Sequence, residues 1–303
     1  MKRVTALVLA WNGLDLTRAT LDSLSRSRMP AGWALHLMVV DNASTDGTVA
    51  AIAADYPHVE LIALAENRRF AGGNNAGLER ALERGDDAVM LINNDVLADP
   101  GMIEHLILAI EQTPEAGGAA PLIYHAAPSD LVWYAGGRCT PWIAHSSHVG
   151  IRERDRGQWR GIEETGYLTG CCLLATREVW QRVGLLDERY FIYAEDADWS
   201  LRARAAGLRL LFVPTARLWH EVSASSGGAI NAWKIHHRLR ANWTLWSTHA
   251  RGLARLTWGP AFIAQQLALM LSLFVRGHAA AAAAVPRALW EACSGRPIEG
   301  AGR

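Results

Sequence analysis

The chain has 303 residues, of which 50% are apolar and 20% charged, and its formal net charge is zero. Such a composition is typical of a globular protein with a substantial core, and the length suits one large α/β domain or two smaller ones. Four cysteines show neither a disulfide framework nor the spacing of a metal site, which favours a reducing, cytoplasmic setting. The N-terminal apolar run ends at Trp11-Asn12, so we expect no signal peptide.

Charge is unevenly distributed along the chain. Nine Lys/Arg and two acids follow residue 232, which leaves 21 basic and 28 acidic residues in the preceding body. A basic tail on an acidic body suggests contact with an anionic membrane, and nucleic-acid binding is the weaker alternative.

The first third of the chain alternates between strand and helix patterns. Apolar, partly β-branched runs predict strands at 4–10, 35–40, 59–64 and 88–92, and each of the first three leads into a helical pattern. This alternation predicts an α/β fold with a mostly parallel sheet and helices on both faces.

The fourth predicted strand ends abruptly in Asn93-Asn94-Asp95. Ligands bind at the carboxyl ends of strands in open α/β sheets, where an Asp can hold a divalent cation and the cation a diphosphate. The alternative is an ordinary Asn/Asp turn.

Two loops argue against other nucleotide-binding classes. The glycines at 72–77 do not have the GxGxxG spacing and follow the third strand, whereas a nicotinamide fingerprint belongs after the first. Residues 11–15, after the first strand, are not the basic, glycine-rich loop of a sugar nucleotidyltransferase.

The middle of the chain is less regular. A helical pattern follows Pro100, and 114–161 is rich in Gly, Pro, His and Ser, with aromatics such as Trp133 and Trp142. We interpret 114–161 either as sugar-binding loops or as an irregular β-region. A strand pattern returns at 167–175, where Cys171 and Cys172 are expected to be small core residues.

Three acids, Glu195, Asp196 and Asp198, open a predicted helix at 199–206. These carboxylates either stabilise the N-terminus of the helix through its dipole, or they include a base whose pKa is tuned by its neighbours. A strand at 208–213 leads to His220, which is a metal ligand or a structural histidine.

These stretches together resemble a family 2 inverting glycosyltransferase of the GT-A fold, in its rhamnosyltransferase-like branch. Residues 39–48 are similar to "VVDNxSxDGT", 67–77 to "NxGFagGnNxG" with Arg69 replacing a glycine, and 195–198 to "EDxD". Asn93-Asn94-Asp95 stands in the place of the metal-binding DxD motif, and 236–242 resembles "yyxxRN".

The resemblance implies a role for each matching residue. Asp196 is the expected general base, and Asp95 and His220 are the expected ligands of Mg²⁺ or Mn²⁺. Arg202, four residues beyond Asp198, is expected to pair with that acid and leave Asp196 reactive. The expected nucleotide-sugar-binding residues are Trp11, Asn12, Asp41, Asn42, Ser44, Asn67, Arg68, Gly73, Asn74, Asn94, Glu195 and Arg240.

The tail is predicted to be helical. By the resemblance, Arg240 approaches the donor diphosphate, and a solvated side chain is the alternative. The apolar run 260–275 is short for a spanning helix and is interpreted as an interfacial one. Packing on the catalytic domain or on a homodimer partner is the alternative.

The sequence therefore predicts a GT-A catalytic domain at 1–225 and a membrane-associating or dimerising helical extension at 226–303. The expected activity is metal-dependent, inverting transfer of rhamnose or a similar sugar from a dTDP- or UDP-linked donor. The expected acceptor is a glycan or a polyprenyl-diphosphate-linked glycan, at the inner face of the cell membrane. A non-catalytic sugar-nucleotide-binding scaffold is the alternative.

Overall fold

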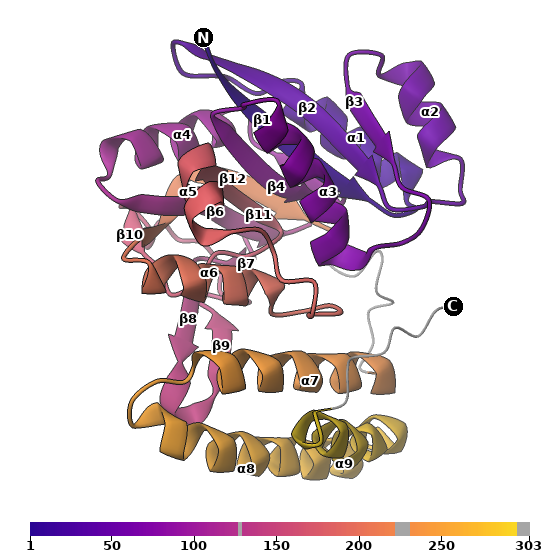
Figure 1. The fold of residues 1–303 in the computed structure, drawn as a ribbon, viewed down its shortest axis with the longest axis vertical. Helices are drawn as coiled ribbons and strands as arrows, with labels where there is room; N and C mark the ends of the chain where they lie inside the picture. The colour runs from indigo at the N-terminus through magenta and orange to yellow at the C-terminus, as the bar shows by residue number, and fades with distance from the viewer. Residues whose placement is uncertain (127–128, 222–230, 296–303) are drawn as a thin grey trace.

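The computed structural model describes residues 1–126, 129–221 and 231–295, and it has a sheet above a layer of helices (Figure 1). The predicted alternation at the N-terminus is confirmed. Its elements are β1 (Lys2–Ala10), α1 (Leu14–Leu24), β2 (Trp33–Asp41), α2 (Thr48–Asp55), β3 (Glu60–Ala63), α3 (Arg69–Glu83) and β4 (Ala88–Asn93). These strands lie parallel in the order β3-β2-β1-β4.

The order of strands reverses between β1 and β4, because the chain moves outward from β1 to β3 and then returns to the other side of β1. Such a reversal leaves a crevice at the carboxyl ends of the two strands, where ligands bind in open α/β sheets. Both strands are buried along most of their length. The crevice is therefore built on two buried strands of the core.

The second half of the body completes the sheet. Its elements are β5 (Val96–Ala98), α4 (Met102–Gln112), β6 (Ala116–His125), β7 (Val132–Tyr134), β8 (Gly137–Thr140), η1 (Pro141–Ile143), β9 (His145–His148), β10 (Glu163–Glu164), β11 (Cys172–Thr176), α5 (Arg177–Val183), α6 (Glu195–Ala205) and β12 (Arg209–His220). The order continues from β4 through β11, β6 and β12 to β10, with β11 antiparallel to both neighbours. The sheet is thus mixed, with a parallel half that carries the crevice.

Residues 114–161, predicted to be sugar-binding loops or an irregular β-region, contain strands β6 to β9, and β6 lies in the centre of the sheet. Its glycines allow close packing: a Cβ added at Gly117 would lie 2.7 Å from Leu208 Cβ. Pro121 lies where the ladder to β12 changes register, so its missing N–H disrupts little pairing. The tertiary context overrides the local signals.

Three helices form a layer on the far side of α6 from the sheet: α7 (Ala232–His249), α8 (Ala254–Val275) and α9 (Ala279–Cys293) (Figure 1). They share a core that includes Leu245, Trp246, Phe262 and Val285, and it continues into the body through Tyr167, Tyr190 and Ala197. The β8–β9 hairpin descends to this layer, where the side chain of Gln265 donates to the carbonyl of Ile143. The predicted helical extension is therefore folded against the body.

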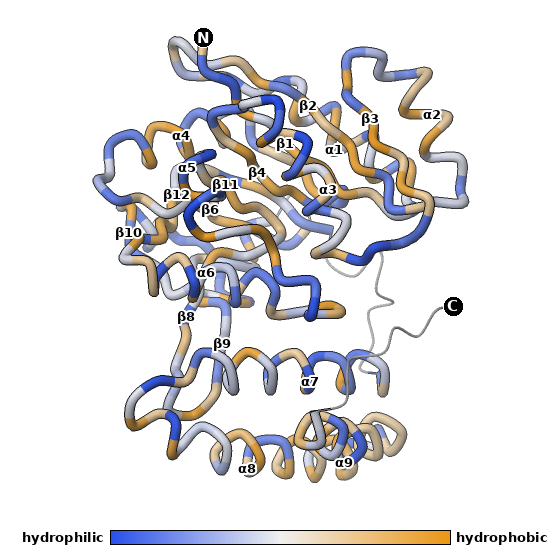
Figure 2. The backbone as a smooth tube through the Cα atoms, in the orientation of Figure 1, coloured by the Kyte–Doolittle hydropathy of each residue, from blue (hydrophilic) through white to orange (hydrophobic). Residues whose placement is uncertain are grey.

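Helix α8 is longer than the predicted 260–275 segment, because it begins at Ala254. Its apolar residues dominate the lower edge of Figure 2. Among the described residues it is the one helix long and apolar enough to cross a membrane by length and composition, and 11% of its apolar window is buried. A core helix can pass the same test of length, but it would be mostly buried.

Candidate active site

Asp41 ends β2 beside the crevice, and its carboxylate is half engaged. Oδ2 accepts from the Ser44 backbone N–H at 2.8 Å, whereas Oδ1 is buried with no hydrogen-bond partner among the described residues. An unpaired buried oxygen costs free energy until a donor reaches it. The ring N–H of a uracil or thymine is such a donor. Trp11, at the end of β1, is 51% exposed and accessible to a ligand.

Asn12 and Ser44 join the two loops beside Asp41. The Asn12 N–H donates to Ser44 Oγ at 2.7 Å, and the Thr45 N–H donates to Asn12 Oδ1 at 2.9 Å. Asn12 has a φ of 57°, which Asn tolerates better than most residues. These two predicted donor-binding residues therefore define the shape of the crevice edge.

The loop before α3 is organised by the side chain of Asn42. Its Oδ1 accepts from the Arg68 N–H at 2.8 Å, and its Nδ2 donates to the Arg69 carbonyl at 2.9 Å. Asn67 Oδ1 accepts from the Arg69 N–H at 2.8 Å. Arg69 has a φ of 63°, a conformation that glycine adopts more easily, and its guanidinium lies 3.9 Å from the centre of the Phe191 ring.

Four further predicted donor-binding residues have structural contacts. Asn94 donates to Thr17 Oγ1, Asn74 donates to the Phe70 carbonyl, and Arg68 forms an ion pair with Glu188 at 3.3 Å. A Cβ added at Gly73 would lie 2.5 Å from Leu9 Cδ1, so this glycine lets α3 pack closely on the sheet. Their contacts shape the site, and none of the four lines the cavity described below.

Asp95 and His220 face each other at the end of β4. The His220 Nε2 lies 3.1 Å from Asp95 Oδ1, but the angles do not make a hydrogen bond. Within the part of the chain that the structure describes, Asp95 Oδ1 and His220 Nδ1 have no hydrogen-bond partner. Both residues are less than 9% exposed. Their spacing is fixed by the backbone, because His220 pairs with Val96 and the Glu221 N–H donates to the Asp95 carbonyl at 2.9 Å.

A carboxylate and an imidazole that share a buried space without bonding fit a divalent cation as two of its ligands. No group of three or more His, Cys, Asp and Glu side chains gathers for a metal within the described ranges. A cation held here would therefore need oxygens from a bound ligand, such as a diphosphate.

Helix α6 begins at Glu195, four residues earlier than predicted, so all three acids lie in its first turn. Two consecutive left-handed residues, Tyr193 and Ala194, turn the chain into it with φ of 72° and 67°. Asp196 Oδ2 accepts from the Gly170 N–H at 2.8 Å. Strained backbone before a reactive acid is a common feature of functional sites.

Burial raises the pKa of Asp196, although the N–H groups of Gly170 and Ala197 oppose that effect. Burial, together with the Asp196 charge, raises the pKa of the neighbouring Glu195 to about 8. A raised pKa makes a carboxylate a better proton acceptor, and Asp196 is the more exposed of the two. Asp196 is thus the better placed base.

Asp198 is fully engaged, as predicted from its spacing to Arg202. Arg202 Nε donates to Asp198 Oδ2 at 2.8 Å, and His249 Nε2 lies 2.7 Å from Oδ1. Burial would raise the pKa of Asp198, but these partners outweigh it and lower the pKa below its ordinary value. The contact of His249, at the end of α7, was not foreseen from the sequence.

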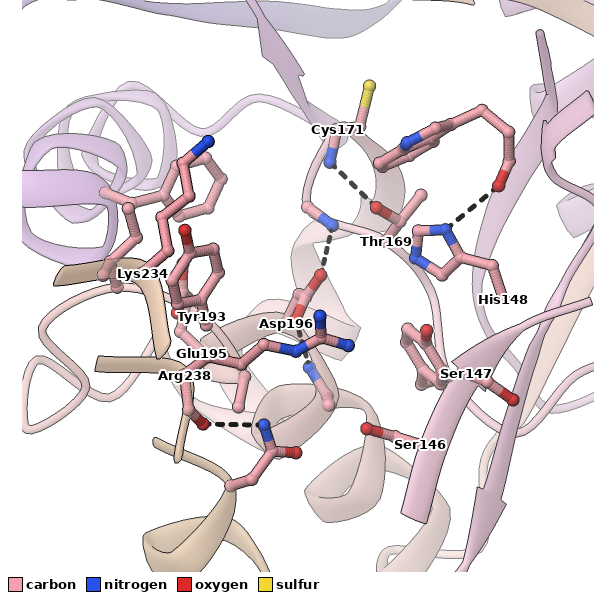
Figure 3. A pocket seen from close by; sticks show the side chains of 18 of the residues that line it. Ser146, Ser147, His148, Thr169, Cys171, Tyr193, Glu195, Asp196, Lys234 and Arg238 are labelled. Carbon is pink, nitrogen blue, oxygen red and sulfur yellow. Dashed lines mark hydrogen bonds between the residues drawn. The ribbon is translucent and has the colours of Figure 1, made fainter. Parts of the chain in front are cut away.

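A cavity of about 760 Å³ lies between α6, the β8–β9 hairpin and α7, and Asp196, Glu195 and His220 line it (Figure 3). Lys234 and Arg238 line it from α7, one helical turn apart. Arg240, predicted to approach the donor diphosphate, forms an ion pair with Glu291 of α9 at 2.9 Å and does not line this cavity. Residues 238 and 240 lie on different faces of α7, and helical spacing alone does not tell which face meets the body.

Comparison with known families decides the identity of the chain. The family described as "Glycosyltransferase like family 2" matches residues 2–244. This chain belongs to that family. The family 2 glycosyltransferase has the GT-A fold, as predicted, and is a nucleotide-sugar-dependent enzyme.

Relatives of this glycosyltransferase include rhamnosyltransferases. It is 32% identical over 210 residues to the N-acetylglucosaminyl-diphospho-decaprenol L-rhamnosyltransferase of Mycobacterium tuberculosis, covering 63% of this chain and 68% of the relative. It is 26% identical over 194 residues to the dTDP-rhamnosyl transferase RfbF of Shigella flexneri, covering 63% and 61% of the two chains.

Solved structures share the fold. The mannosyltransferase PcManGT of Pyrobaculum calidifontis, in complex with GDP-Man and Mn²⁺, superposes with a TM-score of 0.57 at 18% identity, over 97% of this chain and 88% of that one. GalNAc-T7, with UDP, GalNAc and Mn²⁺, gives a TM-score of 0.64 at 15% identity, over 81% and 48%. At these identities the likeness supports the fold alone.

Proposed function

We propose that this enzyme is a metal-dependent, inverting rhamnosyltransferase that transfers its sugar from a dTDP- or UDP-linked donor to a lipid-linked glycan. The observation that carries the proposal is the placement of Asp196 in one cavity with His220, the partner of Asp95. The rhamnosyltransferases among its relatives support the choice of sugar. The partner-free oxygen of Asp41 supports a pyrimidine base in the donor.

The chemistry requires a base and a stabilised leaving group. Asp196 takes the proton of the acceptor hydroxyl while the oxygen of that hydroxyl attacks the anomeric carbon. Such general-base assistance raises the rate by about 10²- to 10⁴-fold. With one base and direct displacement, the anomeric configuration inverts. Asp95 and His220 would hold a Mg²⁺ or Mn²⁺ ion, which when bound stabilises the charge of the departing diphosphate.

The environment of Asp196 suits this role. Burial disfavours its charged form, so a proton gained from the acceptor is retained more readily. Asp198, two residues away, is held by Arg202 and His249 and is not free to compete. Asp196 and Asp198 on α6 therefore divide into a reactive and a supporting group.

We also propose that the helical layer contacts the inner face of the cell membrane. Helix α8 contains no acid, and its ends carry exposed Arg255 and Arg276. Its exposed apolar residues include Leu271 at 62% and Phe274 at 67%. Trp142, in the hairpin tip that lies against α8, is 53% exposed. Exposed apolar side chains with flanking cations suit an anionic bilayer.

Vesicle binding tests the membrane contact. The protein should sediment with vesicles containing phosphatidylglycerol, and Leu271→Ser with Phe274→Ser should reduce the bound fraction. Sedimentation equilibrium distinguishes the alternative: a dimer that dissociates in the double variant, with no vesicle binding, would assign this face to a second copy of the chain.

The variant Asp196→Asn tests the catalytic proposal. It should abolish transfer from dTDP-rhamnose while calorimetry shows dTDP binding with Mn²⁺ largely intact. Asp187→Asn, an acid in the loop before α6 that pairs with exposed Arg189, is the matched control and should keep activity. Preserved turnover in Asp196→Asn would remove the base assignment. Nucleotide binding without turnover in the wild type would favour the scaffold.

A further inference from the structure

Helix α7 carries two sets of basic side chains with different surroundings. His236 and Arg240 face α9, where they lie 3.1 and 2.9 Å from the Glu291 carboxylate. Lys234 and Arg238 face the cavity instead, and neither forms an ion pair within the part of the chain that the structure describes. One set is neutralised by the fold, and the other is left for a ligand.

The cavity has little anionic charge to balance these two cations. Its acids are Glu195 and Asp196, and burial disfavours the charged form of both. Its histidines are His145, His148 and His220, which add no negative charge. An anionic ligand would therefore gain from two cations that share one wall of the cavity.

The donor diphosphate would meet a different wall of this cavity. His220 lines the cavity from β12, beside Asp95 at the carboxyl end of β4, whereas Lys234 and Arg238 line it from α7. Asp196 lines the same cavity as the two cations. An acceptor whose hydroxyl reaches Asp196 would thus place its other end toward α7.

We propose that Lys234 and Arg238 bind the phosphate groups of the acceptor and so select a phosphate-linked glycan over an uncharged one. This inference rests on the proposed transferase function. Residues 234 and 238 stand four apart on α7, so both can contact one diphosphate. Ile235 and Ile192 supply apolar surface beside them for the start of a lipid chain.

Comparison of two acceptors tests the proposal. One is the acceptor sugar on a short prenyl diphosphate, and the other is the same sugar as an uncharged hexyl glycoside. Lys234→Ala and Arg238→Ala should each raise KM for the diphosphate acceptor about 10- to 100-fold, as expected for a lost charged hydrogen bond. KM for the hexyl glycoside should change less than twofold, and Arg238→Lys should recover part of the loss.

Two controls separate this role from others. Arg26→Ala removes an exposed charge on the body and should leave both KM values unchanged. The pH profile of kcat with the hexyl glycoside should be the same in Arg238→Ala and the wild type. An equal rise in KM for both acceptors, or a shifted pH profile of kcat, would overturn the proposal. Either result would show that Arg238 acts by tuning the protonation of Asp196.

A binding measurement makes the test independent of turnover. Protein saturated with dTDP and Mn²⁺ should bind a short prenyl diphosphate, and Lys234→Ala and Arg238→Ala should weaken this binding about 10-fold or more. Weaker dTDP binding in the same variants would instead assign the two cations to the donor. A wild type that binds the prenyl diphosphate but transfers nothing would contradict the proposed function and leave this binding site standing.

Discussion

Replacement of Asp198 by Asn is expected to destabilise the enzyme although Asp198 does not line the cavity. Its side chain is 2% exposed, and it interacts with Arg202, His249 and, at 3.3 Å, the Tyr190 hydroxyl. These partners come from α6, the loop before it and the end of α7. The carboxylate thus ties α6 to the C-terminal layer.

The size of the effect follows from the contacts. Removal of one member of a buried ion pair costs about 3–5 kcal/mol, because the other charge is left without its partner. Arg202 keeps two carbonyl acceptors, Val183 at 2.6 Å and Leu185 at 2.8 Å, and Asn keeps the shape of Asp. We therefore expect the lower end, about 3 kcal/mol.

Urea unfolding at pH 7 measures this loss, with Asp196→Asn as the matched variant on the same helix. Because burial disfavours the charge of Asp196, its replacement should leave the free energy of unfolding unchanged or raise it.

The pKa of Asp198 is lowered in the folded protein. Its contribution to stability is therefore present above the pKa of the unfolded chain and is lost as pH falls through the folded pKa. Wild type and Asp198→Asn should therefore converge in stability below about pH 4. A cost under about 0.5 kcal/mol, within the range of ordinary surface substitutions, would refute the argument.

Three further outcomes are expected. Gly77→Ala should lower the free energy of unfolding by about 1–3 kcal/mol in urea titrations, since its Cβ would lie 2.3 Å from Leu7 Cδ1; an unchanged midpoint would contradict the close packing. Glu195→Gln should raise the free energy of unfolding more at pH 8 than at pH 5. The folded pKa of Glu195 is raised to about 8, so the stability of the wild type falls as pH rises above the pKa of this group in the unfolded chain. Equal gains at pH 5 and pH 8 would exclude this cause. Chelation, Asp95→Ala or His220→Ala should each weaken calorimetric binding of dTDP with Mn²⁺, and metal-independent binding in the wild type would count against the cation site.

Periodicity and motif order predicted the parallel half of the sheet because those strands are apolar and bounded by clear turns. Strand β6 was not foreseen, since Gly117, Gly118 and Pro121 are depleted in strands and its pairing depends on distant partners. The early start of α6 was also missed. The two left-handed residues before it are not glycines, so the turn has no local signature.

The motifs indicated where several acids lie in the fold. Asp41 and Asp95 lie at or just after the ends of β2 and β4, and Asp196 lines the cavity from the first turn of α6. Asn42 and Asn67 shape a loop, a role that sequence cannot separate from ligand binding because the same amide serves both. The ion pair of Arg240 with Glu291 was not foreseen, because α7 is packed on both sides and its partners lie far apart in the chain.

The ladder that holds His220 beside Asp95 has a consequence for how the family can vary. Strand β12 shifts register between Val213 and Arg217 before it pairs with β5. Loss of one residue in that irregularity would present a neighbour of His220 to Asp95, since adjacent side chains in a strand point to opposite faces. The length of the segment between Val213 and Arg217, as much as the identity of residue 220, therefore determines which side chain of β12 faces Asp95.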